Sequence, residues 1–127
     1  MFLRRNDKIE TLIGQKSAFK GDVTTEGTIR IDGSFTGDVS AEWVIVGESG
    51  NVKGNITAKG IIIGGIVEGN LKSDDIVEIK STGRLTGDIH TKKLSVSEGG
   101  MFEGRSFIKR EDDSKVIDFP AKESASM

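Results

Sequence analysis

The chain of 127 residues contains no cysteine and no tyrosine, and it has a single histidine and a single proline. Without cysteine it can form no disulfide, bind no zinc through thiolates and use no thiol nucleophile. His90 alone cannot build a metal site of several imidazoles, and it leaves the commonest acid–base catalyst in one copy. These absences predict no catalytic, metal-binding or cofactor-binding residues, and they fit a reducing compartment such as the cytoplasm.

The sequence also lacks charge of one sign and long apolar runs. Its 18 basic and 20 acidic residues give a net charge of −2, and Lys and Arg form no cluster of the kind that binds phosphates. No apolar run approaches the ~20 residues of a membrane-spanning helix. No signal-peptide stretch follows the N-terminal basic residues either. We therefore expect no nucleic-acid partner, no spanning helix and no export by a signal peptide.

Glycine, in contrast, is plentiful and regularly placed. All 17 glycines lie between Gly14 and Gly104, whereas Pro120 lies outside this range. One motif, an apolar residue, any residue, Gly, Asp or Asn, and an apolar residue, recurs with a mean spacing of 16.6 residues between glycines. Self-similarity at such a period indicates a repeat architecture. The six copies read FKGDV, FTGDV, VKGNI, VEGNL, LTGDI and, with a changed ending, FEGRS.

Alternate positions agree between the copies, which is typical of strands with one buried face. One copy places Phe35, Gly37, Val39 and Ala41 at these positions, and the others match it. A second run rich in β-branched residues lies between the copies, and neither run has helical spacing. Its predicted inward pairs are Ile29 and Ile31, Val44 and Val46, Ile61 and Ile63, Val77 and Ile79, and Leu94 and Val96.

Strands repeated at this period predict an all-β solenoid, a parallel β-helix of about six coils of 16–17 residues. Each coil should advance by one strand spacing of ~4.8 Å and stack on the coil before it. A sandwich of hairpins would need turns such as Asn-Gly or Asp-Gly, and only Asp32-Gly33 is present. We expect a flexible N-terminal tail over residues 1–10, a β-helix over 11–108 and a disordered C-terminal tail over 109–127.

Two polar features allow a functional and a structural interpretation. His90 falls between two inward positions, so it should face solvent, where a lone imidazole is usually only solvated. A column of Asp and Asn residues follows the repeated glycines, and stacked carboxylates can bind calcium. Asp and Asn also favour chain turns, and we prefer this corner role, with a short ladder between Asn55 and Asn70. The column comprises Asp22, Asp38, Asn55, Asn70 and Asp88.

Apolar residues in exposed positions indicate contact surfaces. Trp43, Ile45, Ile62 and Ile76 should point outward on adjacent coils as one patch, called here the Trp43 patch. It either binds another molecule or is covered by a terminal tail. The two ends of a β-helix also expose strand edges, and no capping helix is predicted. Phenylalanines at the terminal coils could close the core or bury against another copy, and they are Phe19, Phe102 and Phe107.

The N-terminal residues combine apolar and basic side chains. They are Met1, Phe2, Leu3, Arg4 and Arg5. Apolar insertion and attraction to anionic lipid would give one copy weak affinity for a membrane, with each basic residue contributing about 1 kcal/mol. A polymer would strengthen that binding through multivalency.

Three features of the sequence can be compared with known families: the repeated motif, the intervening IRI, VIV and VEI runs, and the ending GDI, SEGG and FEG. In these features the chain resembles the bactofilins, bacterial cytoskeletal proteins, over Ile9 to Phe107. The resemblance implies a right-handed parallel β-helix that polymerises end to end, without nucleotide, into non-polar filaments. It implies a cytoplasmic scaffold at the inner face of the membrane, linked to cell shape and cell-wall synthesis or hydrolysis enzymes. It places the membrane-targeting segment at Met1 to Arg5 and the C-terminal polymerisation phenylalanine at Phe107 or Phe102.

Two hypotheses about function follow. The first is a structural homopolymer whose rods stack at their ends, with Phe19, Phe102 and Phe107 at the junctions. The second is a non-polymerising adaptor that binds one partner protein through the Trp43 patch. An enzyme is not expected, because the sequence offers no set of convergent reactive groups.

Overall fold

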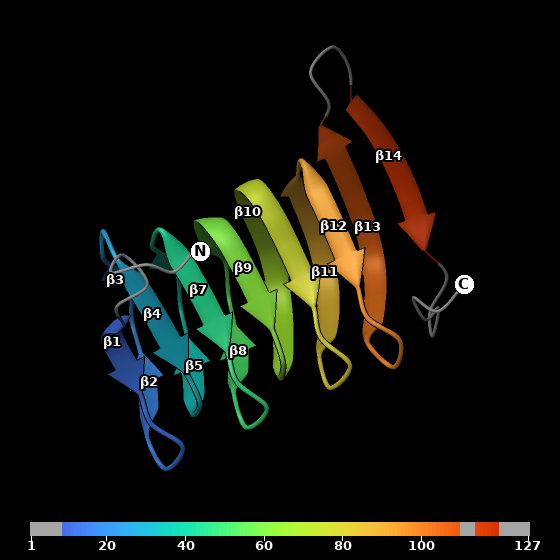
Figure 1. Ribbon diagram of the computed structural model, residues 1–127. Coiled ribbons are helices and arrows are strands. Elements are labelled where there is room, and N and C mark those ends of the chain that lie inside the picture. Colours follow the sequence, from blue (N-terminus) through green and yellow to red (C-terminus); the bar gives the residue numbers. More distant parts are fainter. Residues whose placement is uncertain (1–8, 110–113, 120–127) are drawn as a thin grey trace.

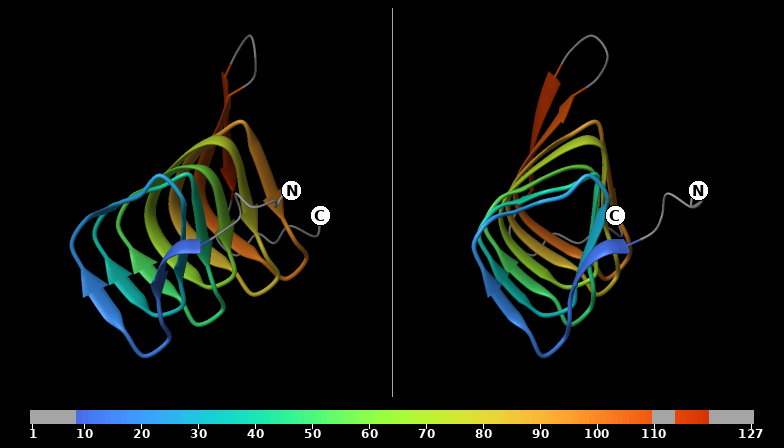
Figure 2. Two further views of the ribbon diagram at one scale, coloured as in Figure 1. Left: turned by 60° about the vertical axis from the view of Figure 1, so that its left-hand side comes forward. Right: turned by 90° about the vertical axis from the view of Figure 1, so that its left-hand side faces the viewer.

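The computed structural model describes residues 9–109 and 114–119, and the side chains of residues 11–108. The described residues form 14 β-strands and no helix. The strands wind into a rod of stacked coils, with β1 at one end and β14 at the other (Figure 1). Seen along the rod, the coils have a three-sided outline (Figure 2). The predicted all-β parallel β-helix of about six coils is confirmed.

Each side of the rod is a parallel sheet with one strand segment per coil. The first face contains β1 (Ile9–Ile13), β4 (Thr28–Ile31), β7 (Trp43–Val46), residues 60–63 of β9 (Ile56–Ile63), residues 76–79 of β10 (Ile66–Ile79) and β12 (Lys93–Val96). The second face contains β2 (Ala18–Lys20), β5 (Ser34–Thr36), β8 (Asn51–Lys53) and the first residues of β10, of β11 (Arg84–Thr91) and of β13 (Met101–Lys109).

The third face begins with two short strands and continues in the later parts of the long ones. It contains β3 (Val23–Thr24), β6 (Val39–Ser40), residues 56–58 of β9, residues 71–73 of β10 and the last residues of β11 and β13. Strand β14 (Ser114–Phe119) then pairs antiparallel with residues 104–109 of β13 and closes this edge.

The register stacks like residues on like residues, so one narrow core runs through all the coils. On the first face Ile29 lies opposite Val44, which lies opposite Ile61. The predicted inward side chains of the inner coils are buried, whereas Leu94 and Val96 are only partly buried. These two residues belong to β12, whose outer edge pairs with no described strand. A strand with one neighbour leaves its side chains less covered.

The repeated glycines form a column where the second face meets the third, and this corner requires them. All six have φ between 135° and 145°, a region that L-residues with a side chain rarely adopt. In addition, a Cβ on Gly37 would overlap the carbonyl oxygen of Gly21 on the preceding coil. Coils can therefore stack at one strand spacing only if this position has no side chain.

The corner between the first and second faces absorbs most of the variation in coil length. Four-residue turns close with a backbone hydrogen bond of 2.8–3.0 Å, as from Gly50 N–H to Gly47 C=O. Other coils cross the same corner in two residues, for example at Asp32 and Gly33. Most of the insertions and deletions seen in the sequence thus lie at this edge of the rod, outside the core. A one-residue difference remains at the corner between the third and first faces, where three residues separate β3 from β4 and two separate β6 from β7.

Strand β14 differs from the sequence-based expectation, which placed no strand after residue 108. Its sequence, SKVIDF, contains two adjacent β-branched residues and an aromatic one, and Pro120 follows it directly. Such a composition favours a short edge strand, and proline suits its end. The signal is not visible from the repeat, because β14 runs antiparallel to it.

Candidate assembly surfaces

The N-terminal end of the rod exposes strand edges on all three faces. Among the described strands, β1, β2 and β3 each pair with one neighbour only, namely β4, β5 and β6. Phe19 belongs to the inward column of the second face and stacks on Phe35, with ring centroids 5.2 Å apart and an interplanar angle of 8°. It is nevertheless 37% exposed, whereas Phe35 is 1% exposed. The core therefore ends here in an open aromatic ring.

The C-terminal end is partly covered. Residues 101–103 of β13 and the whole of β12 have a described neighbour on one side only. Residues 104–109 of β13 are instead paired with β14, which presents its own outer edge. Phe102 lies in the same inward column as Phe19 but is only 2% exposed. Of the two roles that the sequence left open for Phe102, its burial fits closure of the core.

Phe107 lies on the outer side of the third face, in the last coil. Its ring stacks on His90 at a centroid distance of 4.4 Å and an interplanar angle of 7°. The Arg105 guanidinium lies 5.8 Å from the same ring and approaches Asp88 at 3.9 Å. Phe107 follows Phe102 by an odd number of residues, so strand alternation could have predicted that it points outward. His90 is exposed, as predicted, and it serves as a stacking partner for Phe107.

The Trp43 patch lies on the first face in two adjacent outward columns. Trp43 and Ile76 share one column with Gly60 between them, and Ile45 and Ile62 are neighbours in the other. All four side chains are half-buried. The Trp43 ring lies over Gly60, where a Cβ would overlap it. The sequence did not predict this contact, since Gly60 lies outside the repeated glycine column.

Leu12 extends this apolar surface toward the N-terminal end. It occupies the same outward column as Ile45, with Arg30 between them, and it is 61% exposed. Arg30 is held by an ion pair of 2.9 Å with Asp32. The first face thus carries apolar side chains from its first strand to its fifth.

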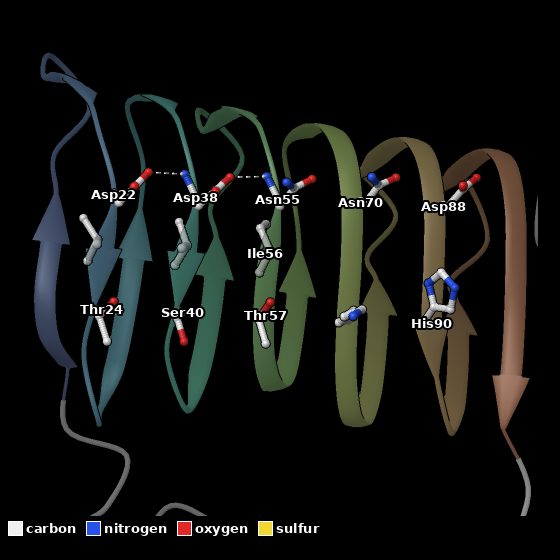
Figure 3. Close-up of a pocket in the computed structure, with 13 residues that line it drawn as sticks. Asp22, Thr24, Asp38, Ser40, Asn55, Ile56, Thr57, Asn70, Asp88 and His90 are labelled. Atoms are coloured by element: carbon white, nitrogen blue, oxygen red, sulfur yellow. Dashed lines mark hydrogen bonds between the residues drawn. The ribbon is translucent and has the colours of Figure 1, made fainter.

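The Asp and Asn column borders a shallow groove of about 540 Å³ on the third face (Figure 3). Its hydrogen bonds join coils: the Asp38 N–H donates to Asp22 Oδ1 at 3.2 Å, and the Asn55 N–H donates to Asp38 Oδ1 at 3.4 Å. Within the described residues, none joins Asn55 to Asn70, and no three acidic or histidine side chains gather as a metal site would require. The geometry agrees with the corner role.

The segment from Met1 to Arg5 lies outside the described residues. Within the part of the chain that the structure describes, no helix could cross a membrane.

Comparison with known proteins places these surfaces in a family context. A sequence model of the family described as "Bactofilin: Polymer-forming cytoskeletal" matches residues 11–106. In Myxococcus xanthus (strain DK1622), the chain is 31% identical to "Bactofilin BacP" over 96 residues, which is 75% of this chain and 40% of that protein. It is 32% identical to "Bactofilin BacO" over 95 residues, which is 74% of this chain and 75% of that protein. The match therefore spans less than half the length of BacP.

A solved structure agrees with the sequence relatives. The chain is similar to one described as "Cryo-EM reconstruction of Thermus thermophilus bactofilin double helical filaments", with a TM-score of 0.67 and 28% identity. The similarity covers 76% of this chain and 98% of that chain. The family match over residues 11–106 coincides with the stacked coils, so the resemblance noted in the sequence is confirmed. The chain belongs to the bactofilin family of polymer-forming cytoskeletal proteins.

Proposed function

We propose that this bactofilin assembles end to end, without nucleotide, into non-polar filaments that attach to the inner face of the cytoplasmic membrane. The observation that carries the proposal is the set of strand edges at the two ends of the rod that pair with no other described strand. Pairing those edges with another copy satisfies backbone groups and buries the open Phe19 ring. Both gains are available to the folded chain itself, so assembly needs no nucleotide.

Phe19 and Phe107 are the proposed contact residues at the two junctions, with Phe102 supporting the C-terminal one from inside the core. Phe19 lies at the end of the inward column, 37% exposed. Phe107 lies in the last coil, on the segment of β13 that pairs with β14. Because they occupy opposite ends of the rod, substitutions at the two positions act on separate contacts when like ends meet.

The two ends differ in a way that favours contacts between like ends. In a head-to-tail filament, the edge of β13 on the third face would continue into the parallel strand β3 of the next copy. Strand β14 already occupies that edge and runs antiparallel to β13. Contacts of N-terminal end with N-terminal end, and of C-terminal end with C-terminal end, avoid this conflict. A filament of alternating like contacts has no polarity.

Attachment to the membrane is assigned to Met1, Phe2, Leu3, Arg4 and Arg5. Apolar side chains followed by two cations suit the boundary between acyl chains and anionic headgroups. One segment binds weakly, but a filament presents many on one scaffold, and their combined binding is much stronger.

The family relationship also supports a scaffold role in cell shape, with cell-wall synthesis or hydrolysis enzymes as partners. Fluorescence microscopy of cells tests this role by comparing where a labelled wild-type chain and a labelled chain without residues 2–5 are found. A scaffold at the membrane should redistribute to the cytoplasm when the segment is removed.

A non-polymerising adaptor remains the second candidate, and the half-buried Trp43 patch is the feature that favours it. Size-exclusion chromatography separates the two functions, because an adaptor elutes as a small species and a polymer elutes near the void volume.

The junction is tested by Phe19→Arg. The substitution places an unpaired cation in the proposed contact, which should cost roughly 3–5 kcal/mol and raise the concentration needed for assembly at least about a hundredfold. Negative-stain micrographs should show filaments of the wild-type chain and none of the variant at the same concentration. Ile66→Arg is the matched control, since Ile66 is 42% exposed in the middle of the second face. Filaments of Phe19→Arg that match those of the control would contradict the junction.

The membrane segment is tested by the double substitution Phe2→Ser with Leu3→Ser. Co-sedimentation with vesicles of phosphatidylcholine and phosphatidylglycerol should be lost, because the apolar part of the segment no longer inserts. Filament formation should persist, which separates the two activities. If binding to the vesicles is unchanged, this segment is not the membrane anchor.

A further inference from the structure

The Trp43 patch is an apolar surface that end-to-end assembly leaves unused. It lies on the first face, on strands β7, β9 and β10, and its side chains are half-buried. Apolar side chains gathered on a sheet surface usually mark a contact. The chain itself contains a suitable occupant in Phe2 and Leu3.

We propose that the Trp43 patch is the docking site for the N-terminal segment of the same chain, with Phe2 and Leu3 as the residues that bury against it. The inference rests on the proposed membrane function of that segment, because it makes docking and lipid binding mutually exclusive. The patch would then hold the segment while the protein is away from a membrane.

The point at which the chain enters the rod supports this assignment. The first described residue, Ile9, pairs with Thr28, which pairs with Trp43. Trp43 pairs with Gly60, and Gly60 pairs with Ile76. Ile9 therefore stands at the head of the row that contains Trp43 and Ile76. The chain thus enters the described part of the rod in this row, two coils before Trp43.

The length of the segment also matches. Trp43 lies two coils from Ile9 and Ile76 lies four, which at one strand spacing per coil is about 10 Å and about 19 Å. Phe2 precedes Ile9 by seven residues, and an extended chain of that length reaches up to about 23 Å. Phe2 and Leu3 can therefore reach any part of the Trp43 patch. Exposed Ile66, on the second face, lies around a corner of the rod.

The competition has a quantitative consequence. If the segment is docked nine-tenths of the time, its apparent affinity for lipid is reduced about tenfold, because only the free fraction binds. Weakening the patch should then strengthen binding to vesicles, although no residue of the lipid-binding segment has changed.

Trp43 is the only tryptophan in the chain, so its fluorescence reports on the patch directly. The measurement uses the full chain with both Phe19→Arg and Phe107→Arg, the double variant that should be monomeric, so that end-to-end contacts do not contribute. Adding Phe2→Ser and Leu3→Ser should shift the Trp43 emission to longer wavelength and increase its quenching by acrylamide, whereas adding Ile66→Ser should change neither. An unchanged spectrum after Phe2→Ser and Leu3→Ser would overturn the proposal. So would an emission maximum that depends on protein concentration, because that result would place a second copy on the patch.

Vesicles provide the second measurement. Phosphatidylcholine and phosphatidylglycerol vesicles should shift the Trp43 emission to longer wavelength as the segment leaves, and Ile62→Ser should increase co-sedimentation up to about tenfold. A shift to shorter wavelength would mean that the patch itself enters lipid, and would overturn the exclusivity. If the vesicles fail to bind the chain while Phe2→Ser and Leu3→Ser still change the emission, docking stands and the proposed membrane function fails.

Discussion

At the scale of single residues, the hydrogen atom that serves as the side chain of Gly37 determines whether two coils can stack. Two separate effects act at this position: a backbone φ of 138°, and a carbonyl oxygen of the preceding coil where a Cβ would lie. Gly21 shares the first effect, with φ 135°, but has no coil before it, and the nearest atom to its Cβ would be 3.5 Å away. A substitution at Gly21 therefore measures backbone strain alone, whereas one at Gly37 measures strain together with the steric overlap between coils.

Alanine substitutions should reveal this difference in the free energy of unfolding. We expect a loss of about 1–2 kcal/mol for Gly21→Ala from backbone strain alone, and of at least about 3 kcal/mol for Gly37→Ala. Gly14→Ala should change the stability by less than about 0.5 kcal/mol, because its Cβ would lie in ordinary contact distance of Ser17 Oγ, 3.9 Å away, and would overlap nothing. Chemical denaturation in the background of the double variant Phe19→Arg with Phe107→Arg, which should be monomeric, measures all three without a contribution from assembly. Equal losses at Gly21 and Gly37 would contradict the stacking argument.

At the scale of elements, strand β14 decides how much of the C-terminal edge is available. Its antiparallel pairing with residues 104–109 of β13 covers part of an edge that would otherwise remain open. Uncovered edges recruit other strands without selectivity. Strand β14 is therefore expected to limit which contacts the C-terminal end can form.

Removal of residues 110–127 should expose the β13 edge and speed up assembly, with thicker and less regular bundles. Light scattering at a fixed concentration follows the rate, and electron microscopy shows the bundles. Removal of residues 120–127 alone is the control, because it leaves β14 in place and should preserve the normal rate. Slower assembly of the longer deletion would show that β14 is itself part of the junction.

The strands of the body were predictable from sequence because each coil repeats the same environment. Alternation and the glycine column predict the buried side chains of residues such as Val44 and Ile61, and the structure places both in the core. Strand β14 was not predictable in this way, since it occurs once and packs on the repeat without belonging to it. The stacking of Phe107 on His90 joins residues of adjacent coils, and it becomes visible only once the register of β11 and β13 is known.

The candidate surfaces were likewise predictable from sequence only in part. Phe19 was expected at the first coil, and the structure adds that its ring is open on one side. The Trp43 patch followed from outward alternation, but its partial burial and the packing of Trp43 on Gly60 depend on which residues meet across coils. Single-strand patterns predict the face on which a residue lies, whereas contacts between coils require the register.

At the scale of the whole molecule, the rod has two different ends, and assembly through like ends predicts an unusual response to substitution. If N-terminal ends contact each other, Phe19→Arg leaves the C-terminal contact intact and should give dimers, twice the 13.7 kDa of one chain. Phe107→Arg should also give dimers, joined through the other end, and the double variant should be monomeric.

Light scattering coupled to size-exclusion chromatography measures these masses. In a head-to-tail filament every contact joins one end to the other, so either single variant would give monomers. If each single variant is monomeric, the contacts are head-to-tail, and the filament is polar instead of non-polar. Ile66→Arg again serves as the control, and it should remain polymeric.

The variable turns at the corner between the first and second faces also make the filament convenient to label. Glu48 and Ser49 are exposed at the tip of a four-residue turn in the third coil, where Ser49 Oγ accepts a hydrogen bond of 2.8 Å from Gln15 Nε2 in the corresponding turn of the first coil. Coils with two residues and with four residues at this corner stack equally well, so a short epitope or dye-binding peptide inserted between Glu48 and Ser49 would project sideways from every subunit. A tag fused to the N-terminus would instead extend the very segment to which membrane attachment is assigned.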